Sequence, residues 1–123
     1  MNQSREFDII IWGASGFTGR LVTLYLFEKY GTTGDLKWAM GGRDLTKLEK
    51  VRDEVADKNV PLVIADSNDK VSLINMVNRT KVICTTVGPY AKYGSNLVEA
   101  CIKSHIHYCD LAGEVQWMYK MIN

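Results

Sequence analysis

The sequence lacks a concentration of charge of one sign and any long hydrophobic run. Its 123 residues include 15 basic and 14 acidic side chains, which are spread along the chain. A basic block is typical of proteins that bind nucleic acid or anionic membranes, so we expect neither and favour small-molecule partners. No apolar run approaches the roughly 20 residues that cross a bilayer, and no signal-peptide core follows the first residue. We therefore expect a soluble, cytoplasmic protein; association of a longer parent with an organelle or membrane surface stays open.

The sequence is also poor in cysteine. Cys84, Cys101 and Cys109 are odd in number, lack a C-x-x-C spacing and lie among apolar residues. This pattern predicts reduced, buried thiols rather than a disulfide framework. His105 and His107 lie close to two of the cysteines, but the spacing matches no zinc site, and we expect no metal.

Short apolar runs alternate with segments of helical periodicity. We expect strands at 7–12, 36–40, 61–65, 81–86 and 106–109, and helices at 21–30, 45–55, 71–77 and 97–102. Asp44 and either Asn68 or Asp69 are placed to cap the second and third helices. The alternation predicts an α/β fold of three layers, with helices on both faces of a doubly wound parallel sheet of strand order 3-2-1-4-5. We expect residues 1–123 to form one domain, the first part of a longer protein.

Three glycines separate the first expected strand from the first expected helix. In this position Gly13 would make the turn, Gly16 would let the backbone approach a pyrophosphate, and Gly19 would let helix and sheet pack closely. The start of a helix offers unpaired N–H groups and a positive dipole end, which suit a phosphate. The alternative is a purely structural turn. The predicted phosphate-binding residues are Gly13, Ala14, Ser15, Gly16, Phe17, Thr18 and Gly19.

The end of the second strand indicates which dinucleotide would bind. An NAD site places an acidic residue there, whereas Arg43 follows Gly41 and Gly42 in this chain. A guanidinium can hold a 2′-phosphate through two hydrogen bonds, and Lys47 adds charge one turn later, so we favour NADP(H) over NAD(H). Asp44 as a ribose acceptor, with Arg43 facing solvent, is the alternative. We expect the two glycines to make room for an adenine ring.

Two further strand ends face the same crevice in the expected sheet. Asp66 and Ser67 could contact the adenine amino group, or could belong to a turn that caps the next helix. The stretch Val87, Gly88, Pro89 and Tyr90 would line the path of the nicotinamide half, or form an ordinary loop.

Other candidates are weaker. Tyr25 and Lys29 have the Tyr-x-x-x-Lys spacing of short-chain dehydrogenases, but they lie directly behind the glycine loop, so we interpret them as a core tyrosine and a surface lysine. Asp110 and Glu114, with Gly113 between them, follow the fifth strand. They could reach a substrate or a nicotinamide ribose, or cap a helix.

Taken together, these motifs resemble the N-terminal domain of the saccharopine dehydrogenase-like oxidoreductases, which include trans-acting enoyl reductases. The resemblance runs from about Phe7 to the last residue and is carried by G13-A-S-G-F-T-G19, G41-G-R43, T86-V-G-P-Y90 and D110-L-A-G-E114. It implies a Rossmann domain that binds NADP(H) through the glycine loop, Arg43 and residues 87–90.

The resemblance also implies a parent oxidoreductase that transfers hydride between the nicotinamide and an unidentified small-molecule or lipid substrate. Family members are about three times as long, and their substrate-binding domain follows the point where this chain ends. We therefore expect the fragment alone to be inactive, and we assign no catalytic residue. A non-catalytic dinucleotide sensor or interaction module is the alternative, and formation of a homodimer stays open.

Overall fold

The computed structural model describes residues 5–86 and 90–110, and within that part strands and helices alternate. The first five elements are β1 (Phe7–Trp12), α1 (Phe17–Tyr30), β2 (Trp38–Gly42), α2 (Leu45–Val55) and β3 (Leu62–Ile64). They are followed by α3 (Lys70–Val77), β4 (Thr80–Thr85), α4 (Tyr90–Ser104) and β5 (His107–Asp110). The predicted order of elements is confirmed.

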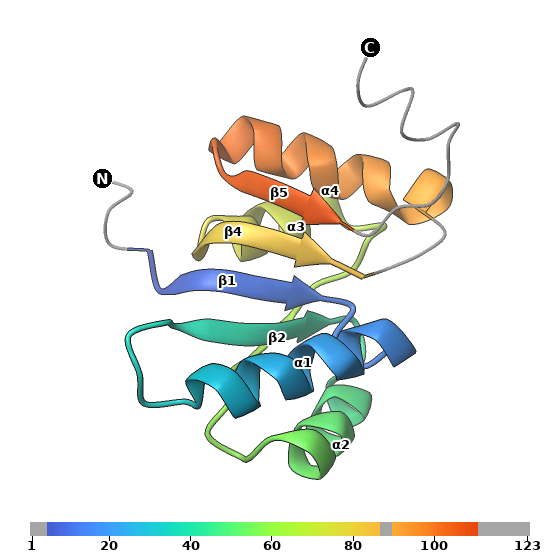
Figure 1. The fold of residues 1–123 in the computed structure, drawn as a ribbon. Coiled ribbons are helices and arrows are strands. Elements are labelled where there is room, and N and C mark those ends of the chain that lie inside the picture. Colours follow the sequence, from blue (N-terminus) through green and yellow to red (C-terminus); the bar gives the residue numbers. More distant parts are fainter. Residues whose placement is uncertain (1–4, 87–89, 111–123) are drawn as a thin grey trace.

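The five strands form one parallel sheet in the order β3-β2-β1-β4-β5, as the alternation predicted (Figure 1). β1 lies in the centre, where Ile11 pairs with Met40 on one side and with Cys84 on the other. Because all strands run the same way, their carboxyl ends meet along one edge, where ligands of such sheets bind.

Side chains that alternate along the strands supply two cores, one on each face of the sheet. Ile10 and Trp12 of β1 pack with residues of α3 and α4, whereas Ile11 packs with residues of α1 and α2. Both faces are therefore apolar, which explains the near-continuous apolar run of β1.

Several element boundaries differ from the sequence prediction, most of all that of α4, which covers Tyr90–Ser104 rather than residues 97–102. α1 begins at Phe17 rather than Leu21, so the last three residues of the glycine loop form its first turn. β2 covers Trp38–Gly42 rather than residues 36–40, because Gly41 and Gly42 pair with Trp12 of β1 and Ile64 of β3. Glycine carries no apolar signal, so the periodicity stopped at Met40.

Core side chains lie close to both Gly41 and Gly42, and Gly42 also lines the candidate pocket, where room for an adenine ring stays a prediction. A Cβ atom on Gly41 would lie 2.9 Å from Cγ2 of Ile10, and one on Gly42 would lie 3.1 Å from Cδ2 of Leu48. The two glycines therefore allow β2 to pack against its neighbours.

Two predictions of burial also need correction. Tyr25 is not a core residue: it is exposed on α1, and the Lys29 ammonium lies 5.6 Å from the centre of its ring. Of the three cysteines only Cys101 is buried, while Cys84 is partly buried and Cys109 is exposed on the edge strand β5. Among the described residues, no helix is both long and apolar enough to cross a membrane.

Candidate functional site

A pocket of about 250 Å³ opens at the carboxyl ends of β1, β2 and β3. It brings together five of the predicted cofactor residues, which come from three separate segments of the chain. Its lining consists of Trp12, Gly13, Ser15, Gly42, Arg43, Asp66, Ser67 and Asn68. Trp12 and Asn68 were not among the predicted cofactor residues, and Gly42 was predicted only to make room for an adenine ring.

The glycine loop is a compact turn held to β2 by backbone hydrogen bonds. The N–H groups of Gly13 and Ala14 both donate to the carbonyl of Gly41, over 2.9 and 3.0 Å, and the Gly16 N–H donates to the carbonyl of Gly13. Gly13 has a φ of 83°, a backbone conformation that residues other than glycine rarely adopt. The predicted turn at Gly13 is confirmed.

The other two glycines of the loop differ in what the protein requires of them. A Cβ on Gly19 would lie 2.1 Å from the carbonyl oxygen of Gly13, so the close packing of α1 on the loop requires glycine. A Cβ on Gly16 would meet only that same oxygen, at 3.5 Å, which is an ordinary contact. Packing therefore explains why position 19 is glycine, but not why position 16 is. A need for space beside the backbone for a ligand would explain the glycine at position 16.

The amino end of α1 differs from those of the next two helices in lacking a side-chain cap. Asp44 accepts from the N–H of Lys47 at α2, and Asp69 accepts from two N–H groups at α3, which confirms both capping predictions. At α1 the capping position is Gly16, and no side chain caps it. The first intrahelical bond runs from Arg20 to Gly16, so the N–H groups of residues 17–19 precede the helical ladder and suit an anion.

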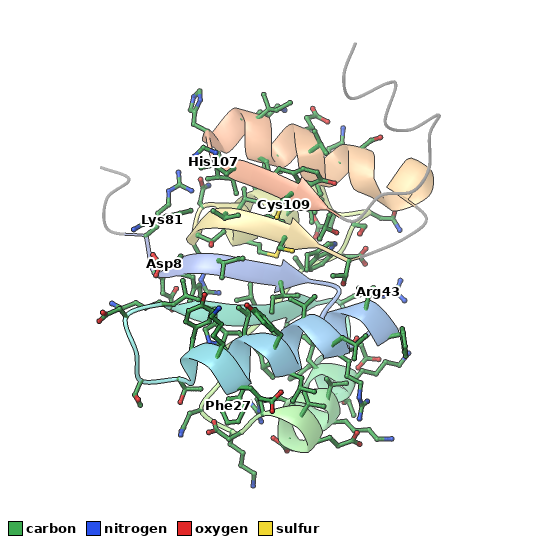
Figure 2. The ribbon with its side chains drawn as sticks, viewed as in Figure 1. Asp8, Phe27, Arg43, Lys81, His107 and Cys109 are labelled. Atoms are coloured by element: carbon green, nitrogen blue, oxygen red, sulfur yellow. The ribbon has the colours of Figure 1, made fainter. Side chains whose placement is uncertain are left out.

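Arg43 supplies a positive charge on the wall of this pocket. Its side chain is exposed and lies at the end of the sheet near the start of α1 (Figure 2). None of the ion pairs among the described residues involves Arg43, whereas nearby Arg20 is paired with Glu54 of α2. The Arg43 guanidinium is thus available to an anionic ligand.

Asp66 and Ser67 line the pocket from an ordered turn. One carboxylate oxygen of Asp66 accepts from the N–H of Asn68 at 2.9 Å, and the Asp66 N–H donates to the hydroxyl of Ser72. The Asn96 side chain on α4 donates to the carbonyl of Ser67, also at 2.9 Å. Asp66 therefore has the turn-forming role that the sequence left open, while its second carboxylate oxygen can still meet a ligand.

Not every predicted residue faces the pocket. Ala14 is fully buried in the core, and Phe17 is 82% exposed with its side chain outside the pocket lining, so Phe17 offers its backbone N–H. Tyr90 begins α4. The side chains of Tyr90 and Asp110 lie outside the described part of the chain, as do all of Val87, Gly88, Pro89, Gly113 and Glu114.

Thr86 supports the glycine loop, a role that the sequence did not predict. Its hydroxyl lies 3.0 Å from the carbonyl oxygens of both Trp12 and Gly13, and shares its proton between them. It thereby joins the end of β4 to the first residue of the glycine loop. Its position at the end of the strand predicted at 81–86 was the only feature of the sequence that could have indicated this role.

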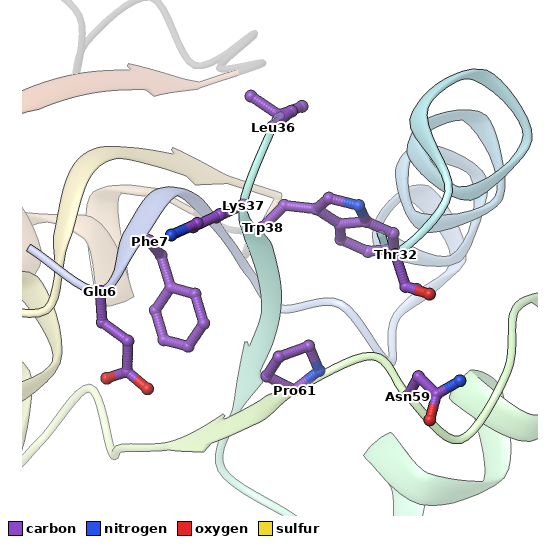
Figure 3. Close-up of a pocket in the computed structure, with 8 residues that line it drawn as sticks. All are labelled: Glu6, Phe7, Thr32, Leu36, Lys37, Trp38, Asn59 and Pro61. Atoms are coloured by element: carbon purple, nitrogen blue, oxygen red, sulfur yellow. The ribbon is translucent and has the colours of Figure 1, made fainter. Parts of the chain in front are cut away.

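A second hollow, of about 190 Å³, lies at the opposite edge of the sheet (Figure 3). Phe7, Leu36, Trp38 and Pro61 give it a largely apolar wall. It lies at the amino ends of the strands, so it is separate from the edge where ligands of parallel sheets bind.

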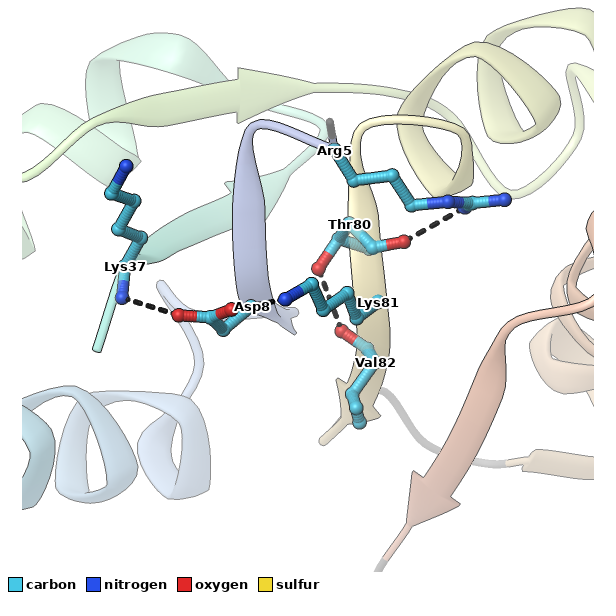
Figure 4. Close-up of polar contacts among 6 residues, drawn as sticks. All are labelled: Arg5, Asp8, Lys37, Thr80, Lys81 and Val82. Carbon is cyan, nitrogen blue, oxygen red and sulfur yellow. Dashed lines mark hydrogen bonds and ion pairs between the residues drawn. The ribbon is translucent and has the colours of Figure 1, made fainter. Parts of the chain in front are cut away.

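Polar contacts fix the strands at that amino edge (Figure 4). One carboxylate oxygen of Asp8 accepts from the Lys37 N–H at 2.9 Å, and the other lies 3.2 Å from the Lys81 ammonium. The hydrogen bond from the Lys37 N–H, together with Lys81, lowers the pKa of Asp8. The Arg5 guanidinium donates to the carbonyls of Val77, Thr80 and Ser104, and so joins β4 to the ends of α3 and α4. No group of metal-binding side chains occurs within residues 5–86 and 90–110.

Comparison with known proteins shows the family of this chain. The family described as the saccharopine dehydrogenase NADP binding domain matches residues 9–122. A trans-acting enoyl reductase from Mycobacterium ulcerans (strain Agy99) is 39% identical over 121 residues, which make up 97% of this chain and 28% of that protein. The chain thus spans less than a third of such a relative.

Solved structures share the fold. The triphenylmethane reductase of Citrobacter sp. superposes with a TM-score of 0.70 at 22% identity, covering 85% of this chain and 36% of that one. A short-chain dehydrogenase/reductase from Veillonella parvula DSM 2008 in complex with NADP has a TM-score of 0.65 at 20% identity, covering 93% of this chain and 55% of that one. By its sequence match and its fold, the chain belongs to the family of saccharopine dehydrogenase NADP-binding domains.

Proposed function

We propose that the pocket beside the glycine loop binds the 2′-phosphate and pyrophosphate of NADPH, and that the chain is the cofactor-binding part of a reductase. The observation that carries this proposal is that Arg43 and the glycine loop line the same hollow. Arg43 contributes a cation that forms no ion pair among the described residues, and the loop leads directly into the uncapped amino end of α1.

Each feature suits a different phosphate. The N–H groups at the start of α1 and the hydroxyl of Ser15 would hold the pyrophosphate, and Gly16 would let it approach the backbone. The planar guanidinium of Arg43 would form paired hydrogen bonds with the 2′-phosphate. Asp66 and Ser67 would contact the adenine. Bound NADPH would supply a hydride, and the protein would orient it.

The substrate of the full-length protein is proposed from its relatives. Because proteins 39% identical to this chain are named enoyl reductases, we propose that NADPH reduces an unsaturated acyl group carried by a small molecule or lipid. This chain aligns with only 28% of such a relative, and we propose that the groups that bind the substrate lie in the rest of the full-length protein.

The test of cofactor binding compares NADPH with NADH by titration calorimetry on the purified protein. We expect Arg43→Ala to weaken NADPH binding by about 1 to 3 kcal/mol, because it removes a charged hydrogen-bonding partner, and to affect NADH much less. Lys58→Ala is the matched control, since it removes one exposed positive charge from the opposite end of the domain.

Two results would count against the proposal. If neither dinucleotide binds the unaltered protein, the pocket has another use. Equal losses for NADPH and NADH in Arg43→Ala would show that Arg43 does not recognise the 2′-phosphate. For the full-length protein, NADPH binding without oxidation in the presence of an enoyl substrate would favour a dinucleotide sensor over a reductase.

A further inference from the structure

Cys84 and Cys109 are far apart in the sequence but directly adjacent in the sheet. Cys84 lies on β4 and Cys109 on β5, and the two residues are register partners in this parallel pair. Partners in register point to the same face of a sheet, so the two thiols stand side by side. Figure 2 shows Cys109 on the strand next to β4.

The spacing of the two strands suits a disulfide. Neighbouring strands lie about 4.7 to 4.9 Å apart, and disulfides join Cα atoms separated by about 4.4 to 6.8 Å. β5 is the last strand of the sheet and is held by β4 alone among the described strands. It can therefore move slightly to let the sulfur atoms meet, without disturbing a second strand.

Both thiols lie outside the two hydrophobic cores. The core beneath α1 and α2 draws its members from β1 to β3 and the helices, with none from β4 or β5 in the described part of the chain. Cys109 is exposed and Cys84 partly so, which makes them accessible to a small oxidant. Cys101 differs: it lies on α4 with its side chain buried in the core, and burial raises the pKa of its thiol to about 12.

We propose that Cys84 and Cys109 are a modification site, at which the two thiols are reversibly joined as a disulfide by a disulfide oxidant such as oxidised glutathione. The exposed Cys109 thiolate attacks one sulfur of the oxidant, which forms a mixed disulfide and releases one glutathione thiolate. The Cys84 thiolate then attacks the Cys109 sulfur and releases the second glutathione. In total, two protein thiols lose two electrons and two protons, and one glutathione disulfide becomes two glutathione thiols.

The test equilibrates the purified protein in glutathione redox buffers and measures intact mass after acid quenching. We expect the protein to lose the mass of two hydrogen atoms as the buffer becomes more oxidising, and to regain it with dithiothreitol. Trypsin digestion without reduction should yield residues 82–92 linked to residues 104–120. Cys84→Ser and Cys109→Ser should each lower the oxidised fraction at least about tenfold, and Cys101→Ser, the matched control, should leave it unchanged.

A second measurement needs no variant. Phenylarsine oxide, which bridges two neighbouring thiols, should bind the unaltered protein once and block two thiols. Failure to bind the arsenical, a disulfide that includes Cys101, a disulfide between two copies of the chain, or stable glutathione adducts at Cys109 without closure would each overturn the proposal.

Discussion

Gly16 and Gly19 lie three residues apart, yet the fold constrains them differently. The backbone of the glycine loop occupies the space that a Gly19 side chain would need, whereas a methyl group on Gly16 would meet only ordinary contact. Substitution of each glycine by alanine can therefore separate two requirements. Gly19 is needed for folding, whereas Gly16 is expected to be needed for cofactor binding.

Gly19→Ala should destabilise the domain strongly. The added Cβ would lie 2.1 Å from a carbonyl oxygen and 2.6 Å from the Ala14 Cα, so the loop or α1 must shift. We expect the free energy of unfolding to fall by at least about 3 kcal/mol, despite the better helix propensity of alanine. Urea denaturation followed by circular dichroism measures this, and an unchanged midpoint would contradict the packing seen here.

Gly16→Ala should leave the fold intact and weaken cofactor binding. Alanine at this capping position costs less than about 1 kcal/mol of stability. The methyl group would stand where the backbone is expected to meet the pyrophosphate, so we expect NADPH affinity to fall at least about tenfold. Titration calorimetry on the folded variant gives the answer, and unaltered affinity would place the pyrophosphate elsewhere.

The helices differ in how their first turns are completed. α2 and α3 are capped by aspartates, while the start of α1 has no side-chain cap. A capped helix end is satisfied within the protein, and an uncapped one leaves N–H groups for solvent or a ligand. Of these three helices, α1 is therefore the one whose start stays available to the ligand that we propose for the pocket.

Asp69→Ala should lower the stability of the domain. The carboxylate accepts from the N–H groups of Val71 and Ser72, and loss of such a cap costs about 1 kcal/mol. Asn75→Ala is the control, because it changes an exposed residue within the same helix and introduces a better helix former. Urea denaturation of both variants should show a loss only for Asp69→Ala; equal midpoints would mean that the cap contributes nothing.

The arrangement of elements could be predicted from the sequence because it follows from local periodicity. Apolar runs alternate with helical segments, and the handedness of crossovers then restricts the order of strands. The residues of the glycine loop, Arg43 and the β3 turn were also predictable, since each follows an expected strand. Their meeting in one pocket is a consequence of that topology.

Contacts between distant residues could not be predicted in the same way. The hydrogen bond from Asn96 to the Ser67 carbonyl joins residues 29 positions apart, and the Thr86 hydroxyl reaches back more than 70 positions. The hydrophobic periodicity of a sequence does not show which distant residue a polar side chain contacts. The true end of β2 was missed for a related reason, since backbone pairing extended it through two glycines.

At the scale of the whole molecule, stability should depend on pH through carboxylates at the amino edge of the sheet. The Lys37 N–H and Lys81 lower the pKa of Asp8 from its ordinary value of 3.8, and Arg79 lowers that of Glu6 from 4.5. The unfolded chain therefore binds more protons in this range. The stability that these two carboxylates contribute is fully present when the pH is above their ordinary pKa values. It is lost as the pH falls through their lower pKa values in the folded protein.

Asp8→Asn combined with Glu6→Gln should reduce this acid sensitivity. We expect the double variant to be less stable than the unaltered protein at neutral pH, and the difference to shrink as the pH falls below about 4. Chemical denaturation across this range would show it. A constant difference at every pH would mean that the two carboxylates contribute nothing to the acid response.

Arg5 has a consequence for how the chain folds during its synthesis. Its guanidinium donates to a carbonyl 99 positions later, and β1 pairs with β4, some 70 residues downstream. β1 can pair with β2 once Gly42 is made, but Arg5 and the β4 side of β1 must wait for residues made much later. Such non-local closure slows folding, and the contacts of Arg5 cannot be completed until Ser104 has emerged.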